Sequence, residues 1–279
     1  MTGHQTFHDL LDRLSIKVGG VVFVHSSFSR LKYLELSPQE IIEILLDRVG
    51  QGGTLVMPSY TWHLDPQYRP WKGYKNYFEQ RPVFDVRHTP TNLGWIPEVF
   101  RKMPETKRSI DYWWSVCAQG PLADLITQAQ QNIRHPYGPG SSFEILRQHD
   151  VRILGLGVTL NTTSLAPIVD FVLGIDHTQQ VFTQQPQVGR IIDFDGEPGE
   201  TASYWLLPDV VRNIKPEATF QESEQLRDET MRADYGDTIH FSYPYRVYFD
   251  EALYLGKLAI EQQTSVPWLR NYPLKSADS

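Results

Sequence analysis

The sequence predicts an α/β fold, and three consecutive segments near its beginning support this. Residues 21–24 form a short run of β-branched and aromatic side chains between Gly20 and His25, which is typical of a buried strand. Residues 37–49 open with Ser-Pro-Gln-Glu, a capped helix start, and continue with one apolar stripe. Residues 52–58 predict the next strand. Strand, helix and strand in this order indicate a βαβ unit with parallel strands.

Similar patterns continue along the chain. Residues 151–158 predict another buried strand, and short stretches in the C-terminal third, including one over 245–249, predict antiparallel strands. We expect Thr91 or Asn92 to cap a helix over 95–101, and Asp250 to cap the last helix. Further helices are predicted over residues 6–14, 122–130, 143–148, 168–173 and 223–232. No repeat or convincing linker divides the chain, so we predict one domain over residues 1–279.

Composition narrows the functional classes. The chain has 279 residues and a net charge of −7, which argues against nucleic-acid binding because nucleic acids select basic surfaces. One cysteine excludes an intrachain disulfide and a cysteine-based zinc site, and the nine histidines are scattered, so we expect no metal. No apolar run approaches the length of a spanning helix, which favours a cytoplasmic protein without membrane insertion.

Polar residues follow two of the predicted strands. His25, Ser26, Ser27 and Ser29 come directly after residues 21–24, and Thr163 and Ser164 follow residues 151–158. In an open α/β sheet, ligands bind at the carboxyl ends of the strands, where hydroxyls and loop amides hold phosphate or carbonyl oxygens. The sequence therefore predicts a ligand site at this edge.

An ordered set of motifs resembles the aminoglycoside 3-N-acetyltransferase family. Val24-His25-Ser26-Ser27 is similar to the family's early V-H-S-S, and residues 53–59 are similar to its G-T-L-V-M-P-[TS]. Further similarities lie, in the family's order, at residues 84–94, 108–109, 136–141 and 154–165. Together the matches run from about residue 20 to 170.

The resemblance implies a three-layer α/β/α sandwich around a mixed central sheet, which binds acetyl-CoA or another acyl-CoA. It also implies acyl transfer to an amine, usually of an amino sugar. The phosphates and amide-bearing arm of CoA need hydroxyls, loop amides and cations. We expect these from one cluster that includes Lys32, from a second that includes Lys107, and from the loop after residues 151–158. The cofactor-binding residues predicted in this way are Ser26, Ser27, Phe28, Ser29, Arg30, Arg108, Ser109, Thr163 and Ser164.

The family's two histidines are absent here. Trp114 stands where one is expected, and Ala166 stands where the other follows Thr-Ser-Leu. An amine nucleophile must lose a proton, so a replacement base is needed. Our candidates are His25, Asp111 and Asp170, with His25 first because it lies at the predicted ligand edge; His88 and His177 are further candidates. As alternatives, the two aspartates are caps or surface charges, and His25 is a hydrogen-bonded strand-end residue.

Aromatic residues supply a candidate wall for the acyl acceptor, because flat rings suit the faces of a sugar. We predict that Tyr60, Trp62, Trp113 and Trp114 bind the substrate. The predicted function is an acyl-CoA-dependent N-acyltransferase acting on an amino sugar or related amine, including a nucleotide-linked sugar for surface polysaccharide. The alternatives are a catalytically impaired CoA- or sugar-binding homologue, and a scaffold with other chemistry. The sequence leaves homo-oligomer formation open.

Overall fold

The computed structural model describes residues 2–61, 83–91, 93–128, 135–175, 181–207, 210 and 213–269. The strands are β1 (Val21–Ser26), β2 (Thr54–Pro58), β3 (Phe84–Asp85), β4 (Lys107–Arg108), β5 (Val116–Gln119), β6 (Val151–Leu156), β7 (Gln187–Ile192), β8 (Pro198–Ser203), β9 (Met231–Tyr235) and β10 (Thr238–Pro244). The α-helices are α1 (Gly3–Arg13), α2 (Pro38–Val49), α4 (Trp95–Lys102), α5 (Ala123–Gln128), α6 (Ser142–Gln148), α7 (Pro167–Leu173), α9 (Glu217–Glu222), α10 (Glu224–Asp228) and α11 (Tyr245–Glu261). Short 3₁₀ turns are η1 (Phe28–Arg30), η2 (Lys32–Leu34), η3 (Leu160–Thr162) and η5 (Pro267–Leu269).

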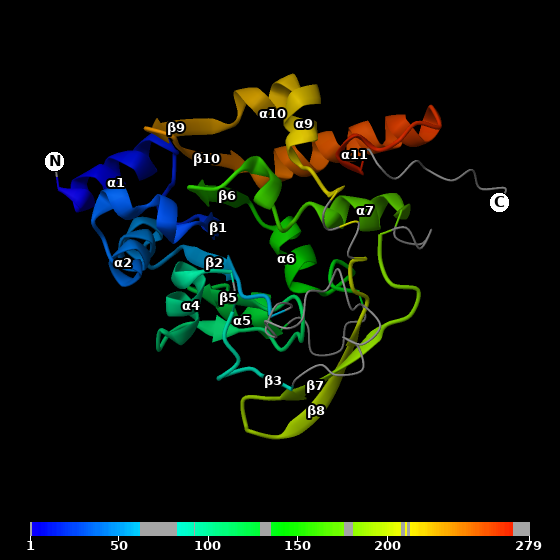
Figure 1. Cartoon of the computed structure of the whole chain (residues 1–279), viewed down its shortest axis with the longest axis horizontal. Helices are drawn as coiled ribbons and strands as arrows, with labels where there is room; N and C mark the ends of the chain where they lie inside the picture. The colour runs from blue at the N-terminus through cyan, green and yellow to red at the C-terminus, as the bar shows by residue number, and fades with distance from the viewer. Residues whose placement is uncertain are drawn as a thin grey trace.

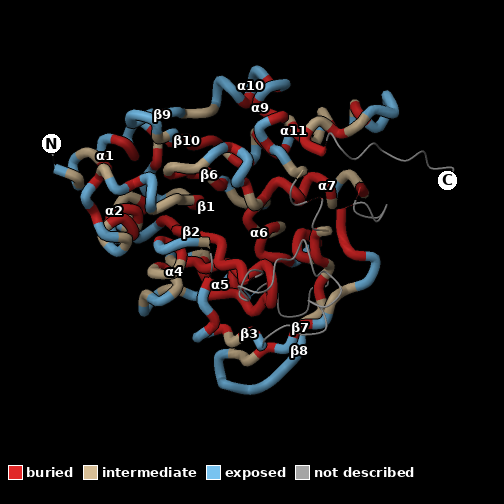
Figure 2. The backbone as a smooth tube through the Cα atoms, in the orientation of Figure 1, coloured by how far each residue is buried: buried red, intermediate tan, exposed pale blue. Residues whose placement is uncertain are grey.

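A seven-stranded mixed sheet forms the centre, in the order β4-β5-β2-β1-β6-β10-β9 (Figure 1). The three central strands, β2, β1 and β6, pair in parallel, whereas β10, β9, β5 and β4 add to the sheet in antiparallel fashion. A second sheet, β3-β7-β8, carries the β7–β8 hairpin, whose connecting turn is exposed (Figure 2). The predicted mixed sheet with antiparallel strands in the C-terminal third is confirmed.

Helices cover both faces of the large sheet and make the three layers. On one face, α1, α2 and α4 pack on side chains such as Val22 and Leu154. On the other face, α5, α6, α7 and α11 pack on side chains such as Phe23 and Ile153. Alternate residues of the same strands reach opposite clusters, as the pleat of a strand requires. The predicted α/β/α sandwich is therefore confirmed.

Local capping signals explain where two helices begin. Ser37 accepts a hydrogen bond from the amide of Glu40, and the Glu40 carboxylate accepts one from the amide of Ser37, which makes a complete capping box for α2. Ser141 caps α6 by accepting from the amide of Glu144. The predicted start of α2 is confirmed, and in both helices the capping signal lies within four residues of sequence.

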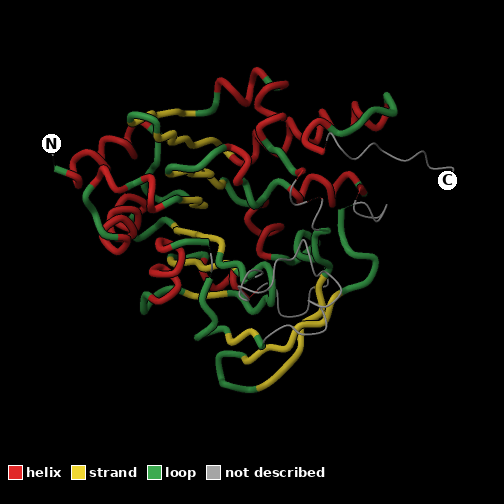
Figure 3. Tube along the Cα trace, viewed as in Figure 1, coloured by secondary structure: helices red, strands yellow, loops and turns green. Residues whose placement is uncertain are grey.

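Four local predictions are wrong. Residues 245–249 are the first turns of α11, and Asp250 lies inside that helix and does not cap it (Figure 3). Five residues are too few to exclude a helix, and the buried side chains Tyr245, Tyr248 and Phe249 follow helical spacing.

The predicted helix over 223–232 ends at Asp228, and residues 231–235 form β9, which completes the edge of the sheet beside β10.

The cap of α4 is Gly94 rather than Thr91, and Asn92 lies outside the described residues. Thr91 instead donates its amide to the carboxylate of Glu98 in the first turn of that helix. Here tertiary pairing and a side chain within the helix override the local signals.

Candidate active site

The carboxyl ends of β1 and β6 lie side by side because the two strands pair in parallel along their full length. Two hydrogen bonds join the loops that follow. The amide of Ser27 donates to the carbonyl oxygen of Leu156 at 2.9 Å, and the amide of Ser164 donates to Nε2 of His25 at 3.4 Å. We call His25, Ser26, Ser27 and Ser164 the strand-end site. The sequence separates its two parts widely, and the sheet brings them together.

His25 is a neutral, buried imidazole. Its side chain is 7% exposed and lies 5.1 Å from the ring of Phe23, centroid to centroid. Burial lowers the pKa of His25 from 6.5 to about 3, because a charged ring would lose its hydration. The ring is therefore uncharged at neutral pH. Because Nε2 accepts the Ser164 amide, Nδ1 carries the single ring proton in this arrangement.

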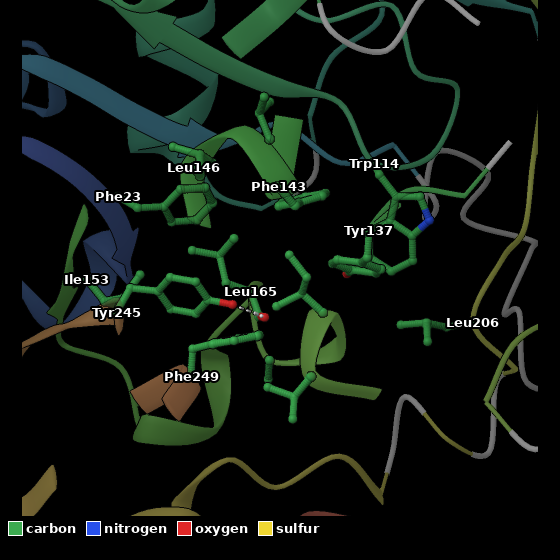
Figure 4. Close-up of a cluster of buried hydrophobic side chains, with 14 of the residues drawn as sticks. Phe23, Trp114, Tyr137, Phe143, Leu146, Ile153, Leu165, Leu206, Tyr245 and Phe249 are labelled. Carbon is green, nitrogen blue, oxygen red and sulfur yellow. Dashed lines mark hydrogen bonds between the residues drawn. The ribbon is translucent and has the colours of Figure 1, made fainter. Parts of the chain in front are cut away.

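Three aromatic residues adjoin Ser164. The ring of Trp114 meets Tyr60 edge-on at 5.1 Å and Tyr137 at 5.7 Å, and Figure 4 shows Trp114 and Tyr137 together. The hydroxyl of Tyr137 donates to the carbonyl oxygen of Ser164 at 3.3 Å. Burial raises the pKa of Tyr60, and the Ser164 side chain opposes that shift. Tyr60, Trp114 and Tyr137 thus form an aromatic wall behind the loop that carries Ser164.

Asp111 holds a turn of the chain. Its Oδ1 accepts the amide of Trp113 at 2.8 Å and also the amide of Trp114. The side chain is 5% exposed, and burial raises its pKa while these two amides oppose the shift. These contacts match the alternative reading of Asp111 as a cap.

Asp170 lies in α7 with no exposed surface. Its Oδ1 accepts the indole N–H of Trp268 at 3.0 Å, which ties α7 to η5. Ala166, which stands where a family histidine is expected, is the buried N-cap residue of the same helix. Of the three predicted catalytic residues, His25 is the one that contacts the loops of the strand-end site.

The loop after β1 offers the predicted hydroxyls and a cation. The Oγ of Ser26 is buried and has no hydrogen-bond partner within the described part of the chain. The hydroxyls of Ser27 and Ser29 are 3.2 Å apart, and Arg30 is exposed at the end of η1, with Phe28 half-buried at its start. An unpartnered buried hydroxyl beside paired hydroxyls and a free guanidinium suits an anionic ligand such as a phosphate.

The loop after β6 is held by tyrosines that sequence reasoning missed. Thr163 donates its hydroxyl to the carbonyl oxygen of Leu160 at 3.1 Å and contacts the hydroxyl of Tyr243. Tyr137, which bonds the next residue, lies in the motif over 136–141 that we interpreted as a turn only. The motif over 136–141 was therefore the sequence signal that could have identified Tyr137. For Tyr243, in β10, the sequence gives none, because the contact depends on strand pairing.

Arg108 lies outside the strand-end site, and its contacts hold distant segments of the chain together. It is 3% exposed, and its guanidinium donates to groups that surround it. Burial lowers the pKa of Arg108 to about 10, so it stays protonated at pH 7. It also lies over the ring of Phe84, 4.7 Å from the centroid. The acceptors around it are the carbonyl oxygens of Ser59, Val86 and Thr89 and the hydroxyl of Ser115.

Its neighbours in sequence are also engaged. Ser109 accepts the amide of Val116 at its hydroxyl, and Lys107 forms an ion pair with Asp124. The polar side chains of the second predicted phosphate cluster are therefore bonded to other groups of the protein.

The remaining candidates are dispersed. Trp113 is 3% exposed and packs against Trp205, with 3.9 Å between ring centroids. His88 is exposed next to a carboxylate from its own turn. Trp62 and His177 lie outside the described residues. Trp113 and Trp114 are both buried, so neither ring presents an open face to solvent.

Two further features are absent from the described residues. These residues contain no group of three or more His, Cys, Asp or Glu side chains arranged to hold a metal ion. Within the same residues, none of the helices combines the length and apolar character needed to cross a bilayer. An open hollow of about 630 Å³ lies at the opposite end of β2, beside Gly53 and Gly120, and includes no residue of the strand-end site.

The fold and the site together define a three-layer α/β protein with a polar ligand edge at the ends of its parallel strands. A sequence model described as aminoglycoside 3-N-acetyltransferase matches residues 23–220. The chain belongs to the aminoglycoside 3-N-acetyltransferase family.

Two relatives illustrate the similarity. The aminoglycoside N(3)-acetyltransferase IX of Micromonospora chalcea is 32% identical over 187 residues, which cover 64% of this chain and 65% of that protein. The aminoglycoside N(3)-acetyltransferase IV of a Salmonella species is 35% identical over 154 residues, which cover 54% of this chain and 52% of that protein. The chain thus matches between half and two thirds of these relatives' lengths.

Solved structures agree in fold over nearly the whole chain. The apoenzyme of the aminoglycoside acetyltransferase AAC(3)-IVa has a TM-score of 0.70 and 22% identity, covering 97% of both chains. The complex described as AAC-IIIb binary with CoASH has a TM-score of 0.67 and 20% identity, covering 94% of this chain and 97% of that one. At this identity the likeness concerns the fold alone.

Proposed function

We propose that this chain is an acyl-CoA-dependent N-acyltransferase whose acyl acceptor is an amine on an amino sugar. The observation that carries the proposal is the meeting of two family-like motifs at one point, where His25 accepts the amide of Ser164. Membership of the family supports the reaction class, and the relatives are named as acetyltransferases of aminoglycosides. The CoASH complex of a protein with the same fold supports a CoA thioester as the donor.

The loop after β1 suits the phosphate end of such a donor. Ser26, Ser27, Ser29 and Arg30 provide hydroxyls and a cation for phosphate oxygens.

In the reaction, the amine nitrogen forms a bond to the thioester carbonyl carbon, and the carbon–sulfur bond breaks. The amine proton passes to a base, and the departing CoA sulfur takes up a proton.

His25 is our proposed base for the amine proton. It is neutral at physiological pH, so its ring can accept a proton through Nε2 once the long bond from the Ser164 amide gives way. Its low pKa makes it a weak base, so we expect a contribution near the low end of the usual range, about a hundredfold. Asp111 and Asp170 remain weaker proposals because each already accepts hydrogen bonds from tryptophan N–H groups.

A second candidate rests on a specific observation. Trp114 and Ala166 occupy the places of the two family histidines, and both are buried. If His25 serves only to hold the Ser164 loop, the chain is a CoA- or sugar-binding homologue with impaired catalysis. This alternative predicts donor binding without turnover.

The test is thiol release from acetyl-CoA with a panel of aminoglycosides, simple amino sugars and nucleotide-linked amino sugars. We expect turnover with at least one class, and the class identifies the acceptor. The His25→Gln variant should lower kcat about a hundredfold, whereas His88→Gln, at an exposed histidine, should leave it unchanged. Tight binding of CoA or of an amino sugar without turnover on the whole panel favours the second candidate. Absence of CoA binding by calorimetry rejects the acyltransferase, and absence of both CoA and sugar binding rejects both candidates.

A further inference from the structure

A pair of stacked tyrosines lies beyond the loop that follows β1. Tyr33, in η2, and Tyr235, at the end of β9, stack with 4.7 Å between centroids and 13° between planes. We call these two residues the tyrosine stack. Tyr235 is 41% exposed, so the stack offers aromatic surface to solvent. Among the described residues, neither hydrophobic core cluster includes Tyr235.

A buried histidine holds the tyrosine stack in place. The Tyr33 hydroxyl and Nε2 of His240 are 3.0 Å apart, and His240 has no exposed surface. The rings of Tyr33 and His240 also meet edge-on at 6.0 Å. Because a fixed partner anchors Tyr33, the platform is rigid before a ligand arrives, which lowers the entropy cost of binding.

Strand register places the stack beside the loop of the strand-end site. Ser26 and His240 both pair with Leu156, so the three side chains share one face of the sheet. Tyr235 pairs with Thr238, two residues before His240, and so lies on that face as well. Thr238 donates its hydroxyl to the carbonyl oxygen of Arg30, which brings the loop and the stack together.

His25 lies on the opposite face. It pairs with Gly155, which in turn pairs with Phe241 of the other core cluster. The loop over residues 26–30 therefore passes between the face that carries His25 and the face that carries the tyrosine stack. A long ligand with its reactive end near His25 would cross this loop and reach the stack with its far end.

Charge along this path fits an anionic linker. Arg30 and Lys32 are exposed in the segment that leads into Tyr33, and within the described residues neither forms an ion pair. Hydroxyls of Ser27 and Ser29 precede them along the loop. The order is a polar strand end, then hydroxyls, then cations, then an aromatic surface. In this order the strand end suits the thioester end, the hydroxyls and cations suit the phosphates, and the aromatic surface suits the purine of an acyl-CoA.

We infer that Tyr235 is the stacking platform for the adenine ring of the acyl-CoA donor, with Arg30 and Lys32 facing its phosphates. The inference rests on the proposed function, since it assigns the far end of the same donor. Base–aromatic stacking tolerates any purine orientation that covers the ring face, so the tyrosine ring matters and its hydroxyl does not.

The experiment is calorimetric titration with adenosine 3′,5′-bisphosphate, which carries the purine and phosphates of CoA without the thioester. Tyr235→Ala should weaken binding of this probe about fivefold to a hundredfold, and Tyr235→Phe should bind as the parent protein does. The matched control is Tyr254→Ala, which removes an exposed tyrosine from α11, away from the stack.

A second measurement separates the two proposals. With an acetylated pantetheine thioester, which lacks the nucleotide, Tyr235→Ala should turn over at the parent rate. If the parent protein binds CoA and Tyr235→Ala binds the bisphosphate as well as Tyr254→Ala does, the adenine assignment is wrong while the proposed function stands. If the parent protein binds neither CoA nor the bisphosphate, both proposals fall.

Discussion

The burial of His25 makes the stability of this protein sensitive to mild acid. With a pKa of 6.5 in the unfolded chain and about 3 in the folded state, His25 binds a proton only after unfolding across that interval. The contribution to stability is thus complete above pH 6.5 and is lost as pH falls toward 3. Between pH 6.5 and pH 5, the loss is about 2 kcal/mol, from 1.5 pH units at about 1.36 kcal/mol each.

The perturbation is His25→Gln, which removes the titrating group and keeps a polar side chain. Urea unfolding at pH 7 and pH 5 should give a fall in unfolding free energy about 2 kcal/mol smaller for the variant than for the parent protein. His240, whose burial lowers its pKa to about 4, titrates equally in both proteins and cancels. Equal pH dependence in parent and variant, or an NMR titration of His25 near pH 6.5, would refute the reasoning.

Three further predictions use urea unfolding as the readout. Ser37→Ala breaks the capping box with Glu40 and should cost about 1 kcal/mol, and an unchanged midpoint would contradict the role of the cap. Arg108→Leu leaves several buried carbonyl oxygens without a donor and should cost at least about 3 kcal/mol; a smaller loss would mean that water replaces the guanidinium. Gly155→Ala would put a Cβ 2.2 Å from the Phe241 ring and should cost about 1–3 kcal/mol, part of which Phe241→Leu in the same chain should restore.

The parts of the fold that sequence predicts well are those with short-range signals. The βαβ unit follows from an apolar run, a capping box between Ser37 and Glu40, and a second apolar run. The stretch over 245–249 shows the limit, because its aromatic and β-branched residues suit a strand until the buried spacing of the whole helix is seen. The choice there depends on packing against α7 and β10, which no local pattern records.

The site divides in the same way. The sequence predicts that polar residues after two parallel strands meet, and His25 and Ser164 are in contact. Arg108 shows what it cannot predict: a Lys-Arg-Ser sequence suits a surface phosphate cluster, yet three carbonyl oxygens from distant segments solvate the guanidinium internally. For Asp111 the sequence likewise gives no sign of the two backbone amides that donate to its carboxylate.

The strand order has a consequence for how the chain folds. Strand β1 has one neighbour, β2, close in sequence, but its other neighbour is β6, where Val21 meets Val151. β6 in turn needs β10 on its far side, which ends at Pro244. During synthesis, β1 therefore stays an open apolar edge until most of the chain has emerged, a state prone to non-native pairing. Late closure of the sheet centre predicts slow folding dominated by non-local contacts, and a C-terminal truncation before β6 should aggregate rather than form a stable half-sheet.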